Sequence, residues 1–411
     1  MAPRDRPISR RARLSFLYFF ALLASYSLLR PLRDEMSVRE GVGKLPWLFS
    51  GTFVAIGLCV ALFGWLAGRL PRRRFLPAAH LVFAATFLVF ASLPGSAAAL
   101  RAAVPAFFIL LNVFSLFAIS ISWSLMSDLF NREEAKRHFG FVAAGGSAGA
   151  LAGPAVTAWL APRVGGPAIL LVLAASFLLL CFGISRTLLS GIDASPIGGR
   201  ALSGISRSLR SPFLRGIAGI VVCTSFLSTV LYFAQVEIVG KAVSSPGERT
   251  RLFALIDLAV NGLSVFLQLS ATGPLLRRWG VGAGLAFVAG AVTLGFAGLL
   301  AAPGLGVLVS LMVVHRALHF AVGRPAREVL FVSLDAETRY KAKSVLDTIV
   351  YRGSDAASAW VLSALHGRGV SLAQTVAFAI PIGVLWTALS FRIGARWEGG
   401  ASGSLAAEAL P

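Results

Sequence analysis

Charged residues are scarce in this sequence of 411 residues. Asp, Glu, Lys and Arg make up 14% of the chain, against about 25% in ordinary soluble domains. Hydrophobic residues make up 56%, and the mean hydropathy is +0.78. A water-soluble protein of this size needs far more polar surface. The composition therefore excludes a soluble enzyme and a disordered chain.

Cysteine is rarer still, with three residues in the whole sequence. The three cysteines, Cys59, Cys181 and Cys223, all fall inside apolar stretches, and none belongs to a Cys-x-x-Cys or His-rich segment. This excludes a disulfide framework and gives no indication of a metal site. We expect the cysteines to be buried packing residues, and we expect no metal or other cofactor.

Acidic residues are outnumbered, with 18 Asp and Glu against 38 Lys and Arg, which gives a formal net charge of +20. In a soluble chain this excess would suggest nucleic acid as a partner. Here the basic loops are short, separated by apolar runs and almost free of interleaved aromatic residues. Nucleic-acid binding is therefore not expected.

Long apolar runs dominate what remains. A bilayer core takes about 20 apolar residues per helix, and the sequence divides into twelve candidate spans on that basis. The chain is thus predicted to be an all-α polytopic membrane protein with the lipid bilayer as its surroundings. The spans are expected at residues 14–36, 45–68, 75–93, 104–128, 139–161, 167–189, 216–239, 252–276, 281–301, 305–326, 344–366 and 372–391.

The spans fall into two sets of six. The segment Gly68–Arg73 after the second span is echoed by Gly273–Arg278 after the eighth, and a second pair of loops repeats at nearly the same offset. Such parallel halves place a substrate site at their interface near mid-membrane. The expected organisation is a basic leader at 1–13, six-helix halves at 14–189 and 216–391, a central linker at 190–215 and a tail at 392–411.

The distribution of arginine and lysine among the loops also predicts the orientation of the chain in the membrane. They are concentrated in the leader, in alternate loops and in the central linker, whereas most intervening loops carry one or none. Because cytoplasmic loops are enriched in Lys and Arg, both termini are expected in the cytoplasm. The first span runs into Arg30 and Pro31 and not into a small-residue cleavage site, so it is expected to be an uncleaved helix.

The loop after the second span resembles the signature of the major facilitator superfamily. The resemblance rests on Leu66-Ala67 and on four positions proposed as a conformational loop, Gly64, Arg69, Arg72 and Arg73. Gly68 and Pro71 depart from the Asp and Gly of the usual pattern. The alternative is a basic loop that serves topology alone.

The fifth span carries glycines four residues apart, Gly145, Gly149 and Gly153, followed by Pro154. This spacing lets two helix backbones approach closely, so helix packing is the expected role. The segment also resembles a helix-5 motif of antiporters in the same superfamily, although Thr157-Ala158 replaces its closing glycine pair.

The end of the first span holds the most informative charges: Arg30, Arg33, Asp34 and Glu35. Charges at membrane depth usually face a polar cavity and mark a transport path. Arg30 and Arg33 share one helical face, and guanidinium groups suit carboxylate or phosphate. We expect the arginines to bind substrate and the carboxylates to pair with them or to carry protons. The alternative is that the span ends at Leu29 and the charges form an ordinary loop.

A second constellation lies around the tenth and eleventh spans. His315 and His319 are one helical turn apart and are expected to act in a proton relay or in substrate hydrogen bonds, with a packing network as the alternative. A metal is not indicated, because no acidic or thiol partner lies nearby in sequence. The remaining candidates are three cations for substrate and two carboxylates for charge pairing or proton relay: Arg316, Lys343 and Arg352, and Asp347 and Asp355.

Three segments together are similar to the ADP/ATP carrier-like branch of the superfamily, which includes bacterial and plastid nucleotide transporters. They are Leu29–Asp34, Glu133–Phe139 and Lys341–Asp347 followed by Arg352-Gly353. The resemblance implies the major facilitator fold, a bacterial cytoplasmic membrane and exchange of nucleotides such as ADP and ATP. Two positions depart from it. Arg33 stands where the first helix of the family has lysine, and Leu111 stands where nucleotide-exchanging members tend to carry a glutamate, with Asn112 beside it.

The function expected from the sequence is secondary active transport of a small anionic solute by alternating access, in a monomer that is not an enzyme. A lipid-handling or intramembrane enzyme, such as a flippase, is one alternative. A membrane subunit that does not itself transport is another.

Overall fold

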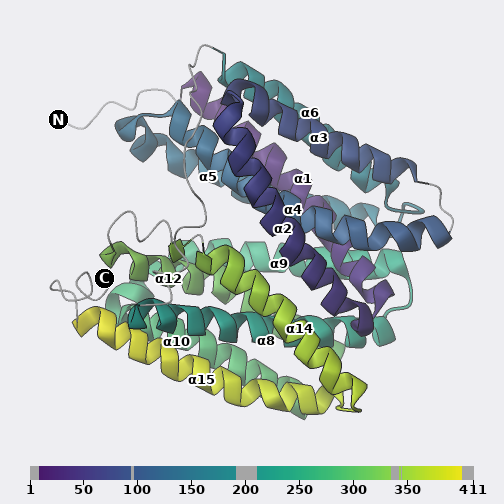
Figure 1. Ribbon diagram of the computed structural model, residues 1–411, viewed down its shortest axis with the longest axis vertical. Helices are drawn as coiled ribbons and strands as arrows, with labels where there is room; N and C mark the ends of the chain where they lie inside the picture. The colour runs from purple at the N-terminus through teal and green to yellow at the C-terminus, as the bar shows by residue number, and fades with distance from the viewer. Residues whose placement is uncertain (1–8, 94–96, 191–210, 335–341, 344, 400–411) are drawn as a thin grey trace. The chain divides into compact units, whose positions relative to one another are not determined.

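In the computed structural model the described residues are 9–93, 97–190, 211–334, 342–343 and 345–399, and every element within them is helical (Figure 1). Parts of the expected leader, central linker and tail lie outside these ranges. Two short elements, His319–Gly323 (η2) and Val345–Val350 (η4), are π-helical. The first seven elements are α1 (Arg10–Glu40), η1 (Val42–Lys44), α2 (Leu45–Arg69), α3 (Arg72–Ser92), α4 (Ala97–Leu129), α5 (Arg132–Leu160) and α6 (Ala168–Leu188). The others are α8 (Pro212–Ala242), α9 (Pro246–Ser270), α10 (Thr272–Ala301), α11 (Leu305–Leu318), η2 (His319–Gly323), α12 (Arg324–Leu330), η3 (Phe331–Ser333), η4 (Val345–Val350), α14 (Tyr351–Gly367) and α15 (Leu372–Gly399).

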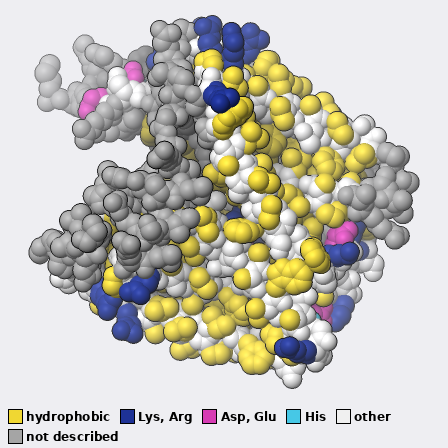
Figure 2. Space-filling view, in the orientation of Figure 1, with side chains coloured by type: hydrophobic (Ala, Val, Ile, Leu, Met, Phe, Trp, Pro, Cys, Tyr) yellow, Lys and Arg dark blue, Asp and Glu magenta, His cyan; other side chains and the backbone are white. Residues whose placement is uncertain are grey.

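Ten helical segments among the described residues are long and apolar enough to cross a membrane. The two other expected spans also form helices: 104–128 lies within α4, whose apolar stretch is Ala103–Ala118, and most of 344–366 lies in η4 and α14. Apolar side chains cover much of the described part of the face in Figure 2, with Lys and Arg gathered mainly towards its margins. This distribution is typical of a surface that faces lipid.

The chain divides into two compact units. Unit 1 comprises Met1–Met36, Leu62–Gly199 and Ser245–Leu258, and unit 2 comprises Ser37–Ala61, Arg200–Ser244 and Ala259–Pro411. The end of α1 and most of α2 thus group with unit 2, and the first half of α9 groups with unit 1, so the two units are not the same divisions of the chain as the two expected halves.

Each unit has a core of packed helices. In unit 1, α3 and α6 lie side by side (Figure 1). The buried rings of Phe87 on α3 and Phe114 on α4 pack edge to face in the core. Tyr18 and His80 add a buried hydrogen bond of 3.0 Å to this core. In unit 2, α10 runs beside α15, and α8 packs against α14 and α15.

Helix α5 begins at Arg132, seven residues before the expected span, because Asn131 caps it. The Asn131 side chain accepts hydrogen bonds from the backbone N–H groups of Glu133 and Glu134 at 3.1 and 2.9 Å. The Glu134 carboxylate accepts one from the Asn131 N–H at 3.2 Å. This capping box satisfies backbone donors that a helix start leaves unpaired. Glu134, in a segment that resembles the nucleotide-transporter branch, therefore has a local structural role.

The glycines of α5 lie directly on the backbone of α1. A Cβ added at Gly145 or Gly149 would collide with the backbone carbonyl oxygens of Phe16 or Phe20, and one at Gly153 would lie 2.8 Å from the carbonyl oxygen of Ala24. Both Gly153 and Pro154 are buried. One turn further on, the Thr157 hydroxyl donates to the Leu28 carbonyl at 2.8 Å. Thr157 thus adds a hydrogen bond between helices where the antiporter motif has glycine.

Helix α10 contains a break at Gly280, whose φ of 81° lies in the left-handed region. Only glycine adopts this conformation without strain. The expected ninth span at 281–301 begins immediately after it.

Candidate polar transport site

The charged segment at the end of the first span is helical. Helix α1 continues through Pro31 to Glu40, so the charges do not form a loop after Leu29. Arg33, Asp34 and Glu35 are 8%, 4% and 0% exposed. Ionisable side chains buried at this depth are costly and usually have a functional reason.

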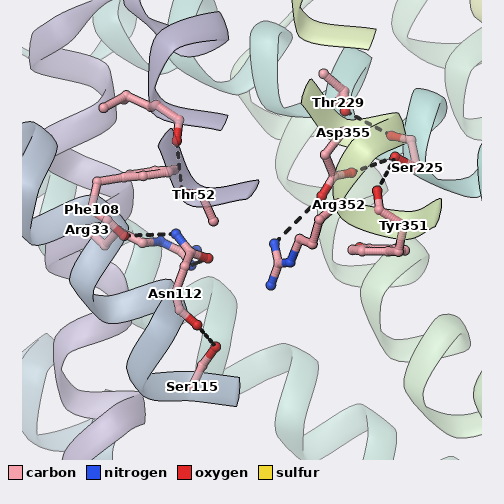
Figure 3. A network of polar contacts seen from close by, with 11 residues as sticks. Arg33, Thr52, Phe108, Asn112, Ser115, Ser225, Thr229, Tyr351, Arg352 and Asp355 are labelled. Atoms are coloured by element: carbon pink, nitrogen blue, oxygen red, sulfur yellow. Dashed lines mark hydrogen bonds and ion pairs between the residues drawn. The ribbon is translucent and has the colours of Figure 1, made fainter. Parts of the chain in front are cut away.

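Arg33 contacts groups from two helices of unit 1 (Figure 3). Its guanidinium donates to the Asp34 carboxylate at 2.7 and 3.0 Å and to the side-chain oxygen of Asn112 at 3.2 Å. It also lies 5.6 Å from the ring centroid of Phe108, one turn before Asn112 on α4. The Asn112 NH₂ donates to the Phe108 carbonyl, which fixes the amide with its oxygen towards Arg33. Asn112, the residue after Leu111, thus supplies the hydrogen bond from α4 to Arg33.

Arg30 lies one turn earlier on α1 and has a different partner. Its Nε is 3.8 Å from a carboxylate oxygen of Asp257 on α9, and Asp257 is 1% exposed. Sequence reasoning did not single out Asp257. The available signal was an acidic residue inside an otherwise apolar span, which by itself marks a candidate functional position.

In unit 2, Asp355 on α14 is the centre of a second cluster (Figure 3). The Ser225 hydroxyl of α8 donates to one Asp355 oxygen at 2.6 Å, and the Arg352 guanidinium lies 3.6 Å from the other. The Thr229 hydroxyl in turn donates to the Ser225 carbonyl at 2.9 Å. Ser225 thus holds Asp355 in place and was not predicted from the sequence.

Two other candidates in unit 2, one cation and one carboxylate, pair with residues that sequence reasoning missed. Lys343 Nζ lies 2.6 Å from a Glu328 oxygen, and Asp347 lies 2.8 Å from Arg327, both partners being on α12. Asp347 lies in η4, which is π-helical.

His315 and His319 lie at the junction of α11 and η2, with ring centroids 6.4 Å apart. His315 is 5% exposed, and its Nε2 has no hydrogen-bond partner among the described residues. No group of three or more His, Cys, Asp or Glu side chains within the described ranges is arranged to hold a metal ion. Arg316, between the two histidines, is half-buried.

A small cavity of about 20 Å³ lies beside His319. Arg327, Tyr351, Thr224 and Trp386 also line it, and the Trp386 indole N–H is buried without a partner in the described structure. A cavity of this size holds about one water molecule.

The residues of the expected conformational loop lie at the α2–α3 connection. Arg69, the last residue of α2, is exposed and stacks over Trp65 at 4.4 Å, and Arg73 is exposed. Gly64 lies within α2 and Arg72 begins α3, and their side-chain surroundings are outside the described part of the structure.

In each of the two units the candidate residues are cations that lie beside carboxylates. Five cations, Arg30, Arg33, Arg327, Lys343 and Arg352, each lie within 4 Å of a carboxylate. Ionisable residues within membrane spans are rare and mark candidate paths for ions or polar solutes.

Comparison with solved structures supports this architecture. A D-xylose-proton symporter matches with a TM-score of 0.65 and 14% identity over 94% of this chain and 98% of that chain. The nucleoside transporter NupG matches with a TM-score of 0.65 and 15% identity, covering 95% and 100%. The human organic anion transporter MFSD10 (TETRAN) matches with a TM-score of 0.60 and 17% identity, covering 94% and 100%. At these identities the likeness establishes the fold alone.

No curated protein matches the chain by sequence. The family model described as Major Facilitator Superfamily matches residues 12–326, which is more than half of the chain. The all-helical fold and the apolar spans agree with this match. The chain therefore belongs to the Major Facilitator Superfamily and is a multi-pass membrane transporter, not an enzyme.

Proposed function

We propose that this transporter carries a small anionic solute by alternating access between its two six-helix halves. The observation that carries the proposal is Arg33, an almost completely buried guanidinium on a membrane-spanning helix, with a carboxylate and an amide oxygen as partners. Two N–H groups of the Arg33 guanidinium donate to one Asp34 oxygen, and the same two donors suit a phosphate or carboxylate of a solute. A solute anion would therefore take the place of Asp34 on Arg33.

Within this class we propose a nucleotide, exchanged in the manner of ADP for ATP, as the first solute to test. Support comes from the segments similar to the nucleotide-transporter branch, Leu29–Asp34 among them. The contact of Asn112 with Arg33 bears on the departure at Leu111, the residue before Asn112. A neutral amide competes less strongly for a guanidinium than a carboxylate does, which favours access of an anionic solute to Arg33.

The unit 2 charges are proposed as the second part of the site. Arg352 and Lys343 would bind the solute, and Arg316 would add positive charge nearby. Asp355, Asp347 and Glu35 would pair with the cations when no solute is present or carry protons. His315 and His319 are proposed to relay protons or to donate hydrogen bonds to the solute.

The test is uptake into proteoliposomes loaded with ATP. Labelled ADP, inorganic phosphate and a set of other organic anions are offered outside, with Arg33→Ala as the site variant and Arg396→Ala, an exposed residue near the end of α15, as the control. We expect wild type and Arg396→Ala to take up at least one anion, and Arg33→Ala to lose most of that uptake. Absence of uptake for every anion would refute the substrate class. Full uptake by Arg33→Ala would refute the assignment of the site.

We also propose a bacterial cytoplasmic membrane, cytoplasmic termini and a monomer. The basic residues of alternate loops, such as Arg69, Arg73, Arg277 and Arg278, support the orientation. Labelling of single cysteines introduced beside Arg73 and beside Arg163 by a membrane-impermeant reagent in intact cells would test it. Labelling of the first and not of the second would refute this topology.

A further inference from the structure

A groove of about 580 Å³ in unit 1 has no part in the polar transport site. It lies where α5 ends and α9 begins, and its floor is apolar. Ala155 and Ala158 of α5 form one side, and Leu255 and Leu258 of α9 form the other. Small side chains facing leucines leave room for a flexible hydrocarbon chain.

Two arginines stand at the rim of this groove. Arg163 stacks over the ring of Trp159 at 5.0 Å and donates a hydrogen bond to the Trp159 carbonyl. Arg251 lies 3.6 Å from a carboxylate oxygen of Glu248, and about half of each side chain is exposed. The pair is therefore weak and open to competition from another anion. Two cations against one carboxylate leave the rim positively charged.

Trp159 places the rim at the edge of the bilayer. It is 60% exposed and is the last residue but one of α5, at the end of a helix apolar enough to span a membrane. Tryptophan is enriched where a span meets the headgroup region. A ligand at this place therefore has its polar part beside the arginines and its apolar part along the membrane-spanning floor.

We propose that this groove binds one anionic phospholipid, with the phosphate between Arg163 and Arg251 and an acyl chain over the alanine and leucine floor. The amphipathic groove favours a lipid over a free anion, because a free anion has no hydrocarbon part to pack against the apolar floor. The positive rim favours an anionic headgroup over a zwitterionic one. Arg251 would exchange Glu248 for the lipid phosphate. The proposal stands independently of the transported solute.

The experiment measures retained lipid and thermal stability. Delipidated protein in a neutral detergent is titrated with phosphatidylglycerol or phosphatidylcholine, and bound lipid is counted by native mass spectrometry. The variant Arg163→Ala/Arg251→Ala removes the rim, and Arg277→Ala/Arg278→Ala removes two exposed arginines beside another exposed tryptophan, Trp279. We expect one tightly retained phosphatidylglycerol in wild type and in the control. We expect the rim variant to bind it about tenfold more weakly, since charge-assisted contacts to the phosphate are lost.

Two further variants distinguish the contribution of the lipid headgroup to binding from that of the acyl chain. Glu248→Gln should strengthen phosphatidylglycerol binding because it removes the competing carboxylate, whereas Ala155→Phe should weaken it because the ring fills the exposed floor. Inorganic phosphate at millimolar concentration should not raise the melting temperature through the rim arginines. If phosphate alone reproduces the effect of the lipid, the groove is a free-anion site and the proposal is wrong. Equal retention of phosphatidylglycerol by the rim variant, or equal loss in the control, would also overturn it.

Discussion

Replacement of Gly149 by alanine tests how closely α1 and α5 pack. The added Cβ would collide with the Phe20 carbonyl oxygen and lie 2.9 Å from the Ala24 nitrogen. Both are backbone atoms of α1, so relief requires the helices to separate. Forcing a methyl group into a packed interface costs about 1–3 kcal/mol. Loss of the conformational freedom of glycine returns about 0.5–1 kcal/mol, which leaves a net cost of about 0–2.5 kcal/mol. Because the contacted atoms belong to the backbone and cannot rotate away, we expect Gly149→Ala to fall in the upper part of this range, at about 1–2.5 kcal/mol.

Gly140 provides a matched control on the same helix. A Cβ there would have no atom within 4 Å, so Gly140→Ala should leave stability unchanged or raise it by a few tenths to about 1 kcal/mol. The measurement is reversible unfolding in mixed detergent micelles with increasing sodium dodecyl sulfate, followed by tryptophan fluorescence. Gly149→Val should be less stable than Gly149→Ala. Equal stability of wild type and Gly149→Ala, or equal changes at both glycines, would refute the reasoning.

Two further substitutions test buried polar contacts. The Nδ1 of His80 lies 2.8 Å from the Leu76 carbonyl oxygen and must carry a proton there, so its Nε2 accepts the Tyr18 hydroxyl. Tyr18→Phe should therefore cost about 1–3 kcal/mol in the same unfolding assay, because a buried acceptor loses its donor, and an unchanged midpoint would contradict that hydrogen bond. Arg327→Ala should cost about 1–3 kcal/mol, below the value for a fully buried pair because Asp347 is partly exposed. Asp347→Asn in the Arg327→Ala background should recover part of this loss, and failure to do so would show that the pair is not the cause.

The sequence predicts the helices well because membrane spans have a strong and local signal. A run of about 20 apolar residues needs no partner to be identified, and Pro31 does not interrupt α1, so the charges of the first span lie within a helix. The predicted helix boundaries are less accurate where a capping residue or a glycine, and not hydropathy, determines where a helix begins or breaks. Asn131 and Glu134 start α5 earlier than hydropathy indicates, and Gly280 breaks α10 at a position that hydropathy does not mark.

The partners of the charged residues could not be predicted, because they come from distant parts of the chain. Arg33 and Asn112 are 79 residues apart, and Arg30 pairs with a carboxylate on α9. Periodicity relates residues on one helix only. Periodicity also gives no sign of the π-helical segment Val345–Val350, which carries Asp347. The sequence thus identifies which charges are unusual but not what they contact.

The pairing of five cations with five carboxylates has an electrical consequence. These pairs contribute no net charge when the empty protein changes conformation, so a membrane potential has no charge to act on in them. Such a potential acts on each unpaired elementary charge with about 2.3 kcal/mol per 100 mV. In the loaded step the solute and any proton bound with it therefore add a charge that these five pairs do not contribute. Transport currents recorded at different voltages would consequently report the valence of what is carried.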